Sequence, residues 1–289
     1  MPISPNSDRR KVTTLSLAAK KKNRQPITMM TAYDYATALV LDRVGMDVIL
    51  VGDSLGMVVL GYENTLSVTM EDMIHHCKAV ARGARFAHLI GDMPFLSYQV
   101  STADAIRNAG RFLQEGGMDA VKLEGGREVA AAIKAIVAAG IPVMGHIGLT
   151  PQSVHKLGGY KVQATSAAAA RRLLEEALVL AESGCYAVIL EAIPDQVAEI
   201  VSQRLSIPCI GIGAGLACDG QVLVSNDLLG SFDRFTPKFA RKYADLSAVM
   251  EQAFLAFIQD VAARRFPTSE HSYHMSEEES AALMRDLRA

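Results

Sequence analysis

The feature that most constrains the fold is a recurring junction between a glycine and a short apolar run. This junction occurs in RVGMDVILVG, EGGMDAVKLEGG, AAGIPVMGH and ESGCYAVILE. A glycine that ends a helix and leads directly into a buried strand produces this pattern. Between the runs, apolar residues recur at helical spacing, as at Ala105, Ile106, Ala109, Phe112 and Leu113. The repeating unit is therefore strand, loop and helix.

These runs predict eight strands. We place them at residues 27–33, 47–52, 85–91, 119–124, 142–147, 186–191 and 208–213, with a short eighth strand near 221–225. Strands that are apolar on both faces belong to parallel sheets covered by helices. Eight such units in 289 residues predict an α/β fold, a (β/α)8 TIM barrel. The alternative is an open doubly wound sheet, but the chain lacks the GxGxxG loop expected after its first strand.

The two ends of the chain are expected to lie outside the barrel proper. We assign residues 1–289 to a single barrel domain, with an extra N-terminal helix in a 1–26 extension that closes the barrel bottom. Residues 275–289 are acidic and are predicted to form a peripheral or disordered tail. The basic cluster of Lys20 to Lys22 with Arg24 is interpreted as a solvated helix end rather than a binding patch.

Composition excludes several classes of protein. The net charge of −2 gives no sign of a nucleic-acid partner. No apolar stretch approaches the roughly 20 residues that span a bilayer, and the first residues lack a hydrophobic signal, so we expect a cytoplasmic protein without a membrane partner. The four cysteines show no CxxC spacing and are expected to be reduced structural thiols.

Ionisable side chains follow five neighbouring candidate strands. They are Asp53 with Ser54 beside it, Asp92, Lys122 with Glu124, His146 and Glu191, and a GIGAG segment at 211–215 follows the next strand. The carboxyl ends of all strands of a parallel barrel converge on one mouth, so these groups are predicted to meet there. Carboxylates crowded in a mouth of low dielectric constant repel one another unless a cation lies among them.

Each group also has a structural interpretation. Asp53 and Asp92 could cap the helices that follow them. Lys122 and Glu124 point to the same side of their strand and could form a mutual ion pair. His146 could be a satisfied core histidine, and GIGAG could be only a tight turn. The combination of all these groups at one place favours a functional site over the separate interpretations.

The combination indicates a particular chemistry. Asp53, Asp92 and Glu124 offer the hard oxygen ligands that Mg²⁺ prefers. A metal held there could chelate a 2-oxo acid and draw charge out of its enolate, with Lys122 adding positive charge. Glu191 could then remove the proton next to the ketone as a general base. The predicted reaction class is proton abstraction beside a carbonyl.

Several long segments resemble one known family, the ketopantoate hydroxymethyltransferases. They are TAYDY (31–35), VGDSLGMVVLGYENTLSVT (51–69), GDMPF (91–95), VKLEGG (121–126), GHIGLTPQSVHKLGGYKVQ (145–163), LEAIP (190–194), and GIGAG followed by CDGQVLV (211–224). The resemblance implies a magnesium-dependent barrel that transfers a hydroxymethyl group from 5,10-methylenetetrahydrofolate to 3-methyl-2-oxobutanoate. The product would be 2-dehydropantoate, formed through a magnesium-stabilised enolate on the route to pantothenate. The resemblance also implies a homo-oligomer, often a decamer.

The resemblance assigns roles to the same residues. It implies that Asp53 and Asp92 bind magnesium beside the substrate and that Glu124 is an acidic residue of the metal shell. It also implies that Ser54 lies next to the substrate and that Lys122 and His146, the latter in the GHIGLTPQ segment, bind the substrate. Glu191 would be the proton acceptor. The loop from 149 to 163, with Gly158 and Gly159 as hinges, is a predicted lid.

Two other functions remain open from the sequence. A Schiff-base 2-oxo acid aldolase would use Lys122 as its nucleophile. A non-catalytic barrel that serves as an assembly subunit would need none of the ionisable groups.

Overall fold

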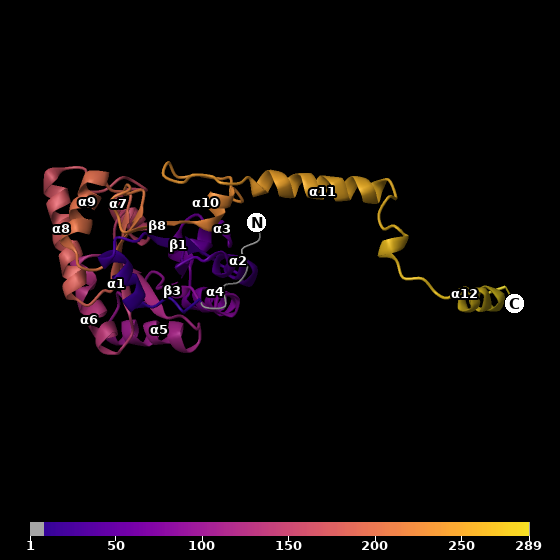
Figure 1. The fold of residues 1–289 in the computed structure, drawn as a ribbon, viewed down its shortest axis with the longest axis horizontal. Helices are drawn as coiled ribbons and strands as arrows, with labels where there is room; N and C mark the ends of the chain where they lie inside the picture. Colours follow the sequence, from indigo (N-terminus) through magenta and orange to yellow (C-terminus); the bar gives the residue numbers. More distant parts are fainter. Residues whose placement is uncertain (1–8, 289) are drawn as a thin grey trace.

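A closed barrel of eight parallel strands forms the core of the compact part of the molecule, which lies at the left of Figure 1. The computed structural model describes residues 9–288. The strands are β1 (Ile27–Thr31), β2 (Val48–Val51), β3 (His88–Asp92), β4 (Ala120–Glu124), β5 (Val143–Gly148), β6 (Ala187–Glu191), β7 (Cys209–Ile212) and β8 (Gly220–Leu223). Each strand pairs with the next in the chain, and β8 pairs with β1. The predicted TIM barrel is confirmed.

Helices cover the outside of the barrel. The longer ones are α2 (Tyr35–Val44), α4 (Met70–Gly83), α5 (Thr102–Gln114), α6 (Ala130–Ala138), α8 (Ala167–Glu182) and α9 (Asp195–Arg204), and the short α3 (Leu55–Val58), α7 (Val154–Leu157) and α10 (Ser225–Leu229) follow strand ends. One repeat lacks its helix: in the described chain, β8 follows β7 without a helix between them.

Alternation along each strand separates two apolar layers. Residues such as Ile90 point into the barrel and pack with one another, whereas Leu89 and its equivalents pack against the helices. Gly91 is required at its position in β3, because a Cβ there would lie 2.2 Å from Cδ1 of Phe112 on α5. The glycine therefore lets α5 lie close to the strand that ends in Asp92.

The predicted N-terminal helix closes the barrel bottom. It is α1 (Thr14–Lys22), and its Leu17 is 1% exposed and packs with the residues inside the barrel. The interpretation of the basic cluster as solvated is wrong for two of its lysines. Lys20 Nζ lies 2.6 Å from Asp47 Oδ1, and Lys21 Nζ lies 2.6 Å from Asp219 Oδ2. These ion pairs fasten α1 to the amino ends of the strands.

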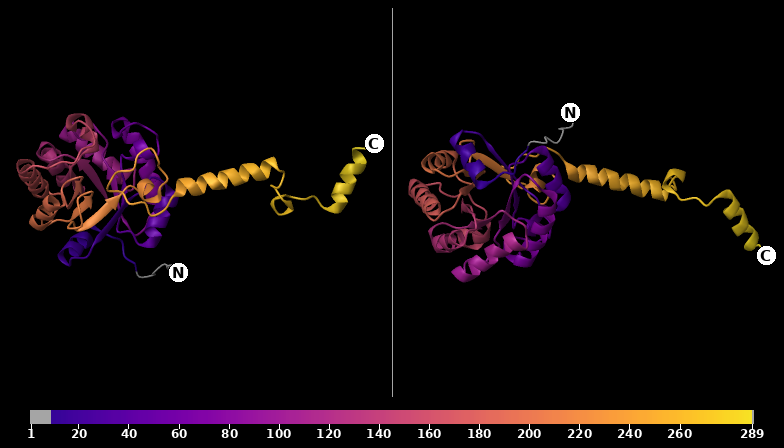
Figure 2. Two further views of the ribbon diagram at one scale, coloured as in Figure 1. Left: turned by 90° about the horizontal axis from the view of Figure 1, so that it is seen from above. Right: turned by 60° about the horizontal axis from the view of Figure 1, so that its bottom comes forward.

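The C-terminal part of the chain leaves the barrel. Figures 1 and 2 show α11 (Leu246–Ala262) leading away from it, with α12 (Glu277–Asp286) at the far end. This segment begins earlier than the tail predicted from residue 275. α11 contains no buried residue, and Phe254 and Ile258 are each 60% exposed. None of the helices described has both the length and the apolar character needed to span a membrane.

Candidate active site

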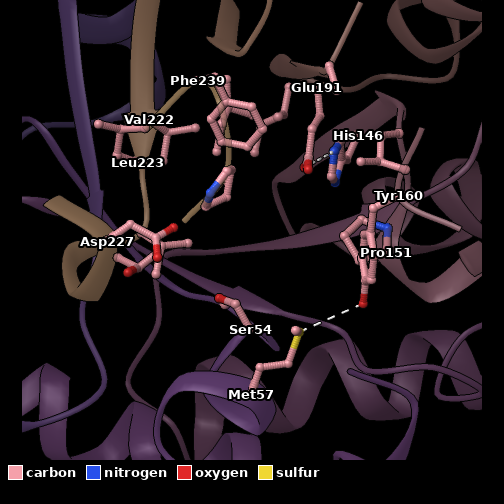
Figure 3. Close-up of a pocket in the computed structure, with 18 of the residues that line it drawn as sticks. Ser54, Met57, His146, Pro151, Tyr160, Glu191, Val222, Leu223, Asp227 and Phe239 are labelled. Carbon is pink, nitrogen blue, oxygen red and sulfur yellow. Dashed lines mark hydrogen bonds and ion pairs between the residues drawn. The ribbon is translucent and has the colours of Figure 1, made fainter. Parts of the chain in front are cut away.

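A cavity of about 370 Å³ opens at the carboxyl ends of the strands. All seven residues predicted from the sequence line it: Asp53, Ser54, Asp92, Lys122, Glu124, His146 and Glu191. Figure 3 shows Ser54, His146 and Glu191 around this space. The convergence of strand ends thus brings the predicted groups together.

Register places Lys122 between carboxylates. Asp92 of β3 pairs with Lys122 of β4, and the amino group lies 2.9 and 2.8 Å from the two oxygens of Asp92. A weaker contact of 3.5 Å joins Lys122 Nζ to Glu124 Oε1 two residues along the strand. Burial lowers the pKa of Lys122, but the carboxylates of Asp92, Glu124 and Asp53 outweigh it and raise the pKa above its usual value. Lys122 is therefore a permanent cation in this site.

Asp53 lies just beyond β2, beside Asp92. Its backbone N–H donates to Asp92 Oδ2 at 3.1 Å, and its own Oδ2 accepts from Gln152 Nε2 at 2.9 Å. Burial, together with the charges of Asp92 and Glu124, raises the pKa of Asp53 well above its usual value. Burial raises the pKa of Asp92 as well, although Lys122 opposes this, so both aspartates bear the electrostatic cost of the crowded carboxylates.

Neither aspartate acts as a helix cap. The N-cap residue of α3 is Ser54, without a side-chain capping bond, and the oxygens of Asp92 face Lys122 and the Asp53 amide. The capping interpretation from the sequence is therefore wrong for both residues.

Ser54 makes a specific contact of its own. Its Oγ lies 2.8 Å from the hydroxyl of Tyr33, which is 4% exposed. Either oxygen can donate in this pair, so the Ser54 hydroxyl is held in place at the cavity wall.

His146 joins two carboxylates from neighbouring strands. Its Nε2 lies 3.1 Å from Glu191 Oε2, a contact drawn as a dashed line in Figure 3, and its Nδ1 lies 3.5 Å from Glu124 Oε1. Both contacts are off the hydrogen-bond axis, so they are ion pairs rather than aligned hydrogen bonds. Burial and Lys122 lower the pKa of His146, but Glu124 and Glu191 outweigh them and raise it to about 9. The ring is therefore an imidazolium at neutral pH and not an inert core histidine.

Glu124 differs from Asp53 in its surroundings. Its Oε2 accepts from the Gln152 backbone N–H at 2.9 Å. Burial raises the pKa of Glu124, but Lys122 and His146 outweigh it, so the pKa falls below its usual value. Two carboxyl groups in one site whose pKa values are pushed apart are typical of a catalytic centre.

Sequence reasoning missed Gln152 as a site residue. It lies in the loop interpreted as a lid, and it bonds to Asp53 by its side chain and to Glu124 by its backbone. Tyr98, which is also buried, donates its hydroxyl to Gln152 Oε1 at 2.7 Å. The only signal in the sequence was the position of Gln152 inside the long GHIGLTPQ segment. The loop is therefore tied to the carboxylates at its start, while Tyr160 and Val162 further along line the cavity.

A second wall of the cavity was also missed. It consists of Val222, Leu223, Val224, Asp227, Phe232, Phe235, Pro237 and Phe239. Gly213 of the GIGAG segment serves this wall, because a Cβ there would lie 2.6 Å from Cδ1 of Phe239. Its φ of +61° also favours glycine. GIGAG is thus a turn that admits an aromatic ring.

The net charge of the ionisable groups in the site favours a divalent cation. Four carboxylates (Asp53, Asp92, Glu124 and Glu191) face two cations (Lys122 and His146), which leaves a charge of about −2 when all are ionised. Over residues 9–288, no three His, Cys, Asp or Glu side chains are gathered closely enough to hold a metal ion by themselves. Asp53, Asp92 and Glu124 offer the oxygen ligands that a cation needs when substrate and water complete its shell, and the role of all three as ligands stays a prediction.

Similarity to known proteins extends over most of the chain. The family model for ketopantoate hydroxymethyltransferase matches residues 11–269. The 3-methyl-2-oxobutanoate hydroxymethyltransferase of Syntrophus aciditrophicus is 55% identical over 271 residues, which cover 94% of this chain and 100% of that protein. The protein of the same name from Dehalococcoides mccartyi is also 55% identical, over 90% of this chain and 93% of its own.

Solved structures of low identity share the barrel. A phosphonopyruvate hydrolase in complex with oxalate and Mg²⁺ superposes with a TM-score of 0.61 at 14% identity, over 95% of each chain. The 2,3-dimethylmalate lyase, a member of the PEP mutase/isocitrate lyase superfamily, gives a TM-score of 0.57 at 14% identity, over 95% of this chain and 98% of its own. At this identity the likeness shows the fold alone. The high-identity relatives and the family model show more: this chain is an enzyme that transfers hydroxymethyl groups, and it belongs to the ketopantoate hydroxymethyltransferase family.

Proposed function

We propose that the chain transfers a hydroxymethyl group from 5,10-methylenetetrahydrofolate to 3-methyl-2-oxobutanoate with the help of Mg²⁺, giving 2-dehydropantoate for pantothenate synthesis. The observation that carries this proposal is the crowding of Asp53, Asp92 and Glu124, which raises the pKa of Asp53 and which a divalent cation would relieve, beside a permanent cation at Lys122. A divalent cation would neutralise the charge of about −2 that the site carries when all its groups are ionised, and it would also bind an anionic 2-oxo acid directly. The names of the high-identity relatives support the same substrate.

The metal would lie at Asp53 and Asp92, and when bound it would draw negative charge from the ketone oxygen of the substrate. Lys122 lies within 3 Å of Asp92, where its charge can also stabilise the anion. Glu191 accepts the proton from C3 of the oxo acid, and His146 orients the Glu191 carboxylate through Nε2.

The remaining bond changes involve the two substrates and water. The C3–H bond breaks, and C3 forms a bond to the one-carbon unit of the donor. Both C–N bonds of the methylene carbon break, water supplies the hydroxyl oxygen, and the C3 proton and one proton of water go to N5 and N10 of the released tetrahydrofolate. The loop over the cavity, which Gln152 ties to Asp53, restricts the access of bulk water to the carbanion.

The Schiff-base alternative needs a neutral amine at Lys122. The three carboxylates that raise its pKa hold it as an ammonium, which is not a nucleophile. We therefore favour the metal-assisted enolate. Borohydride treatment with the oxo acid should leave Lys122 unmodified, and a covalent adduct at Lys122 would instead support the aldolase.

Isotope exchange tests the proposed function. The protein is freed of metal with a chelator and placed in heavy water with 3-methyl-2-oxobutanoate, and deuterium uptake at C3 is followed by NMR with and without added Mg²⁺. We expect uptake that depends on Mg²⁺, and 2-dehydropantoate once the folate donor is added. Absence of both reactions in the folded protein would reject the proposal and favour the assembly-subunit alternative.

We also propose that the chain forms a homo-oligomer through α11. The apolar side chains of this helix are exposed, including Phe254, Phe257 and Ile258. An apolar groove of about 400 Å³ lies on the barrel wall between α2 and α10, lined by Val40, Leu41 and Leu228 among others. A second copy can cover both surfaces at once by exchanging α11.

The mass in solution tests this proposal. Light scattering should give a multiple of the 31.1 kDa chain, with ten copies for the decamer that the family resemblance implies. The double variant Phe254→Asp with Ile258→Asp should reduce the mass, whereas Glu251→Gln on the same helix should not. A monomeric parent protein would contradict the proposal.

A further inference from the structure

The second wall of the cavity contains one carboxylate among apolar residues. Asp227, in the short α10, is 6% exposed and lines the cavity together with Val222, Phe232 and Phe239. Figure 3 shows Asp227 on the opposite side of the space from Glu191 and His146. Asp227 therefore lies outside the carboxylate group that surrounds Lys122.

No described residue donates a hydrogen bond to the Asp227 carboxylate. Its neighbours in the chain, Ser225 and Asn226, bond to Thr31 and Ser231 instead. Burial raises the pKa of Asp227 to about 6, although Lys242 lowers it. The Asp227 oxygens are not sealed inside the protein but open to the cavity, so a ligand bound there can reach them and supply the donors.

The shape and chemistry around Asp227 restrict that ligand. Phe232, Phe235 and Phe239 line the same wall, and aromatic side chains of this kind can pack against a flat ring. A carboxylate with two free oxygens is matched by two parallel N–H donors on one edge of such a ring. The edge of a 2-amino-4-oxopyrimidine, with its ring N–H and its amino group, has this arrangement.

We propose that Asp227 binds the 2-amino-4-oxopyrimidine edge of the tetrahydrofolate donor, with the aromatic wall against the pterin ring. This inference rests on the proposed function, because that function supplies a reduced folate as the second substrate. The pterin then lies across the cavity from Glu191, which leaves the one-carbon unit facing the oxo acid. Lys161 and Lys238 line the same cavity and are exposed, so positive charge is available for the anionic glutamate tail.

Binding of tetrahydrofolate itself tests the inference. Isothermal calorimetry of the full-length protein with tetrahydrofolate compares the wild type, Asp227→Asn and the control Asp233→Asn, which changes an exposed aspartate near the same wall. We expect the dissociation constant to rise about 10- to 100-fold for Asp227→Asn, because one charge-assisted pair is lost, and to stay unchanged for Asp233→Asn. Unchanged affinity in Asp227→Asn would overturn the inference.

A second measurement needs no variant. An analogue of tetrahydrofolate that lacks the 2-amino group should bind the wild type about tenfold or more weakly, and equal binding of the two compounds would overturn the inference. Deuterium uptake by the oxo acid is measured in parallel on the wild type. If uptake fails, the proposed function fails. If uptake occurs and the analogue binds equally well, only the assignment of Asp227 fails.

Discussion

The two ends of the barrel use their aspartates in opposite ways. At the amino ends of the strands, Asp219 accepts from Lys21, from the Cys209 amide at 2.8 Å and from the Ser202 hydroxyl at 3.2 Å. At the carboxyl ends, Asp53 has one side-chain donor, Gln152, and two carboxylate neighbours that raise its pKa. The bottom is electrostatically satisfied by the protein, whereas the top contains crowded carboxylates that the cation of our proposal would satisfy. The amino ends of the strands therefore contribute to stability, and the carboxyl ends contain the site proposed for function.

The largest expected effect is at the top, at the proposed base. Glu191→Gln should lower hydroxymethyl transfer and deuterium uptake about 10³-fold, because an amide cannot accept the C3 proton. The matched control is Glu182→Gln at the end of α8, which should retain full activity. Retention of deuterium uptake by Glu191→Gln would place the base elsewhere.

Asp53 is expected to lower the stability of the fold while it supports activity, because its carboxylate repels the neighbouring carboxylates. Asp53→Asn should lower turnover at least about 10²-fold while raising the free energy of unfolding by about 1 kcal/mol in the presence of chelator. Because the pKa of Asp53 is raised on folding, its contribution to stability is present below its ordinary pKa and is lost as pH rises through the folded value. The variant should therefore gain most over the wild type at neutral pH and lose this advantage in acid. A lower stability of Asp53→Asn at neutral pH would contradict this account.

The equivalent change at the bottom should have the opposite result. Asp219→Asn removes the ion pair to Lys21, whose side chain is 13% exposed, and should cost about 1–3 kcal/mol of unfolding free energy. Turnover at a temperature where the variant is folded should stay within about twofold of the wild type, because the pair lies at the far end of the barrel from the proposed site. Denaturant unfolding and initial rates measured on the same sample would show whether the two ends are independent.

The smallest expected effect is a difference in pKa between two buried histidines, one at each end of the barrel. Burial lowers the pKa of His88 at the bottom, with Lys11 adding to this and Asp119 opposing it, to about 4. His146 at the top has its pKa raised to about 9. NMR spectra of the imidazole nitrogens recorded across the pH range should find the two rings titrating on opposite sides of neutral pH. Titration of both near the usual value would remove the contrast.

These shifts have opposite consequences for stability. The contribution of His146 is complete below its unfolded pKa and is lost as pH rises through about 9. The contribution of His88, which is neutral in the folded chain, is lost as pH falls from its unfolded pKa toward about 4.

The barrel was predictable because each unit repeats a local signal. The glycine before each apolar run and the alternation along each strand fix which residues face the interior, and Lys122 and Glu124 follow from that phase. The missed residues depend on contacts between distant segments. Gln152 and Asp53 are separated by 99 positions, and no local pattern marks their hydrogen bond. Asp227 lies in a helix of five residues, which is too short for a periodic signal.

The position of the exposed α11, away from the barrel, could not be predicted from the sequence either. Its apolar residues favour a helix packed on its own barrel, and only the arrangement in space shows the helix leading away from it (Figure 2). The lysines of α1 were misread for the same reason, because their aspartate partners lie 27 and 198 positions away.

Closure of the barrel bottom by Leu17 and α1 has a kinetic consequence. Within residues 9–288, α1 closes one end of the barrel, and the groups proposed to bind the oxo acid lie deep in the cavity that opens at the other end, with Lys122 only 3% exposed. The folate would then enter after the oxo acid, and tetrahydrofolate would leave before the new oxo acid does. Steady-state kinetics should accordingly show a compulsory order of addition, in which tetrahydrofolate bound to the free enzyme blocks the entry of the oxo acid.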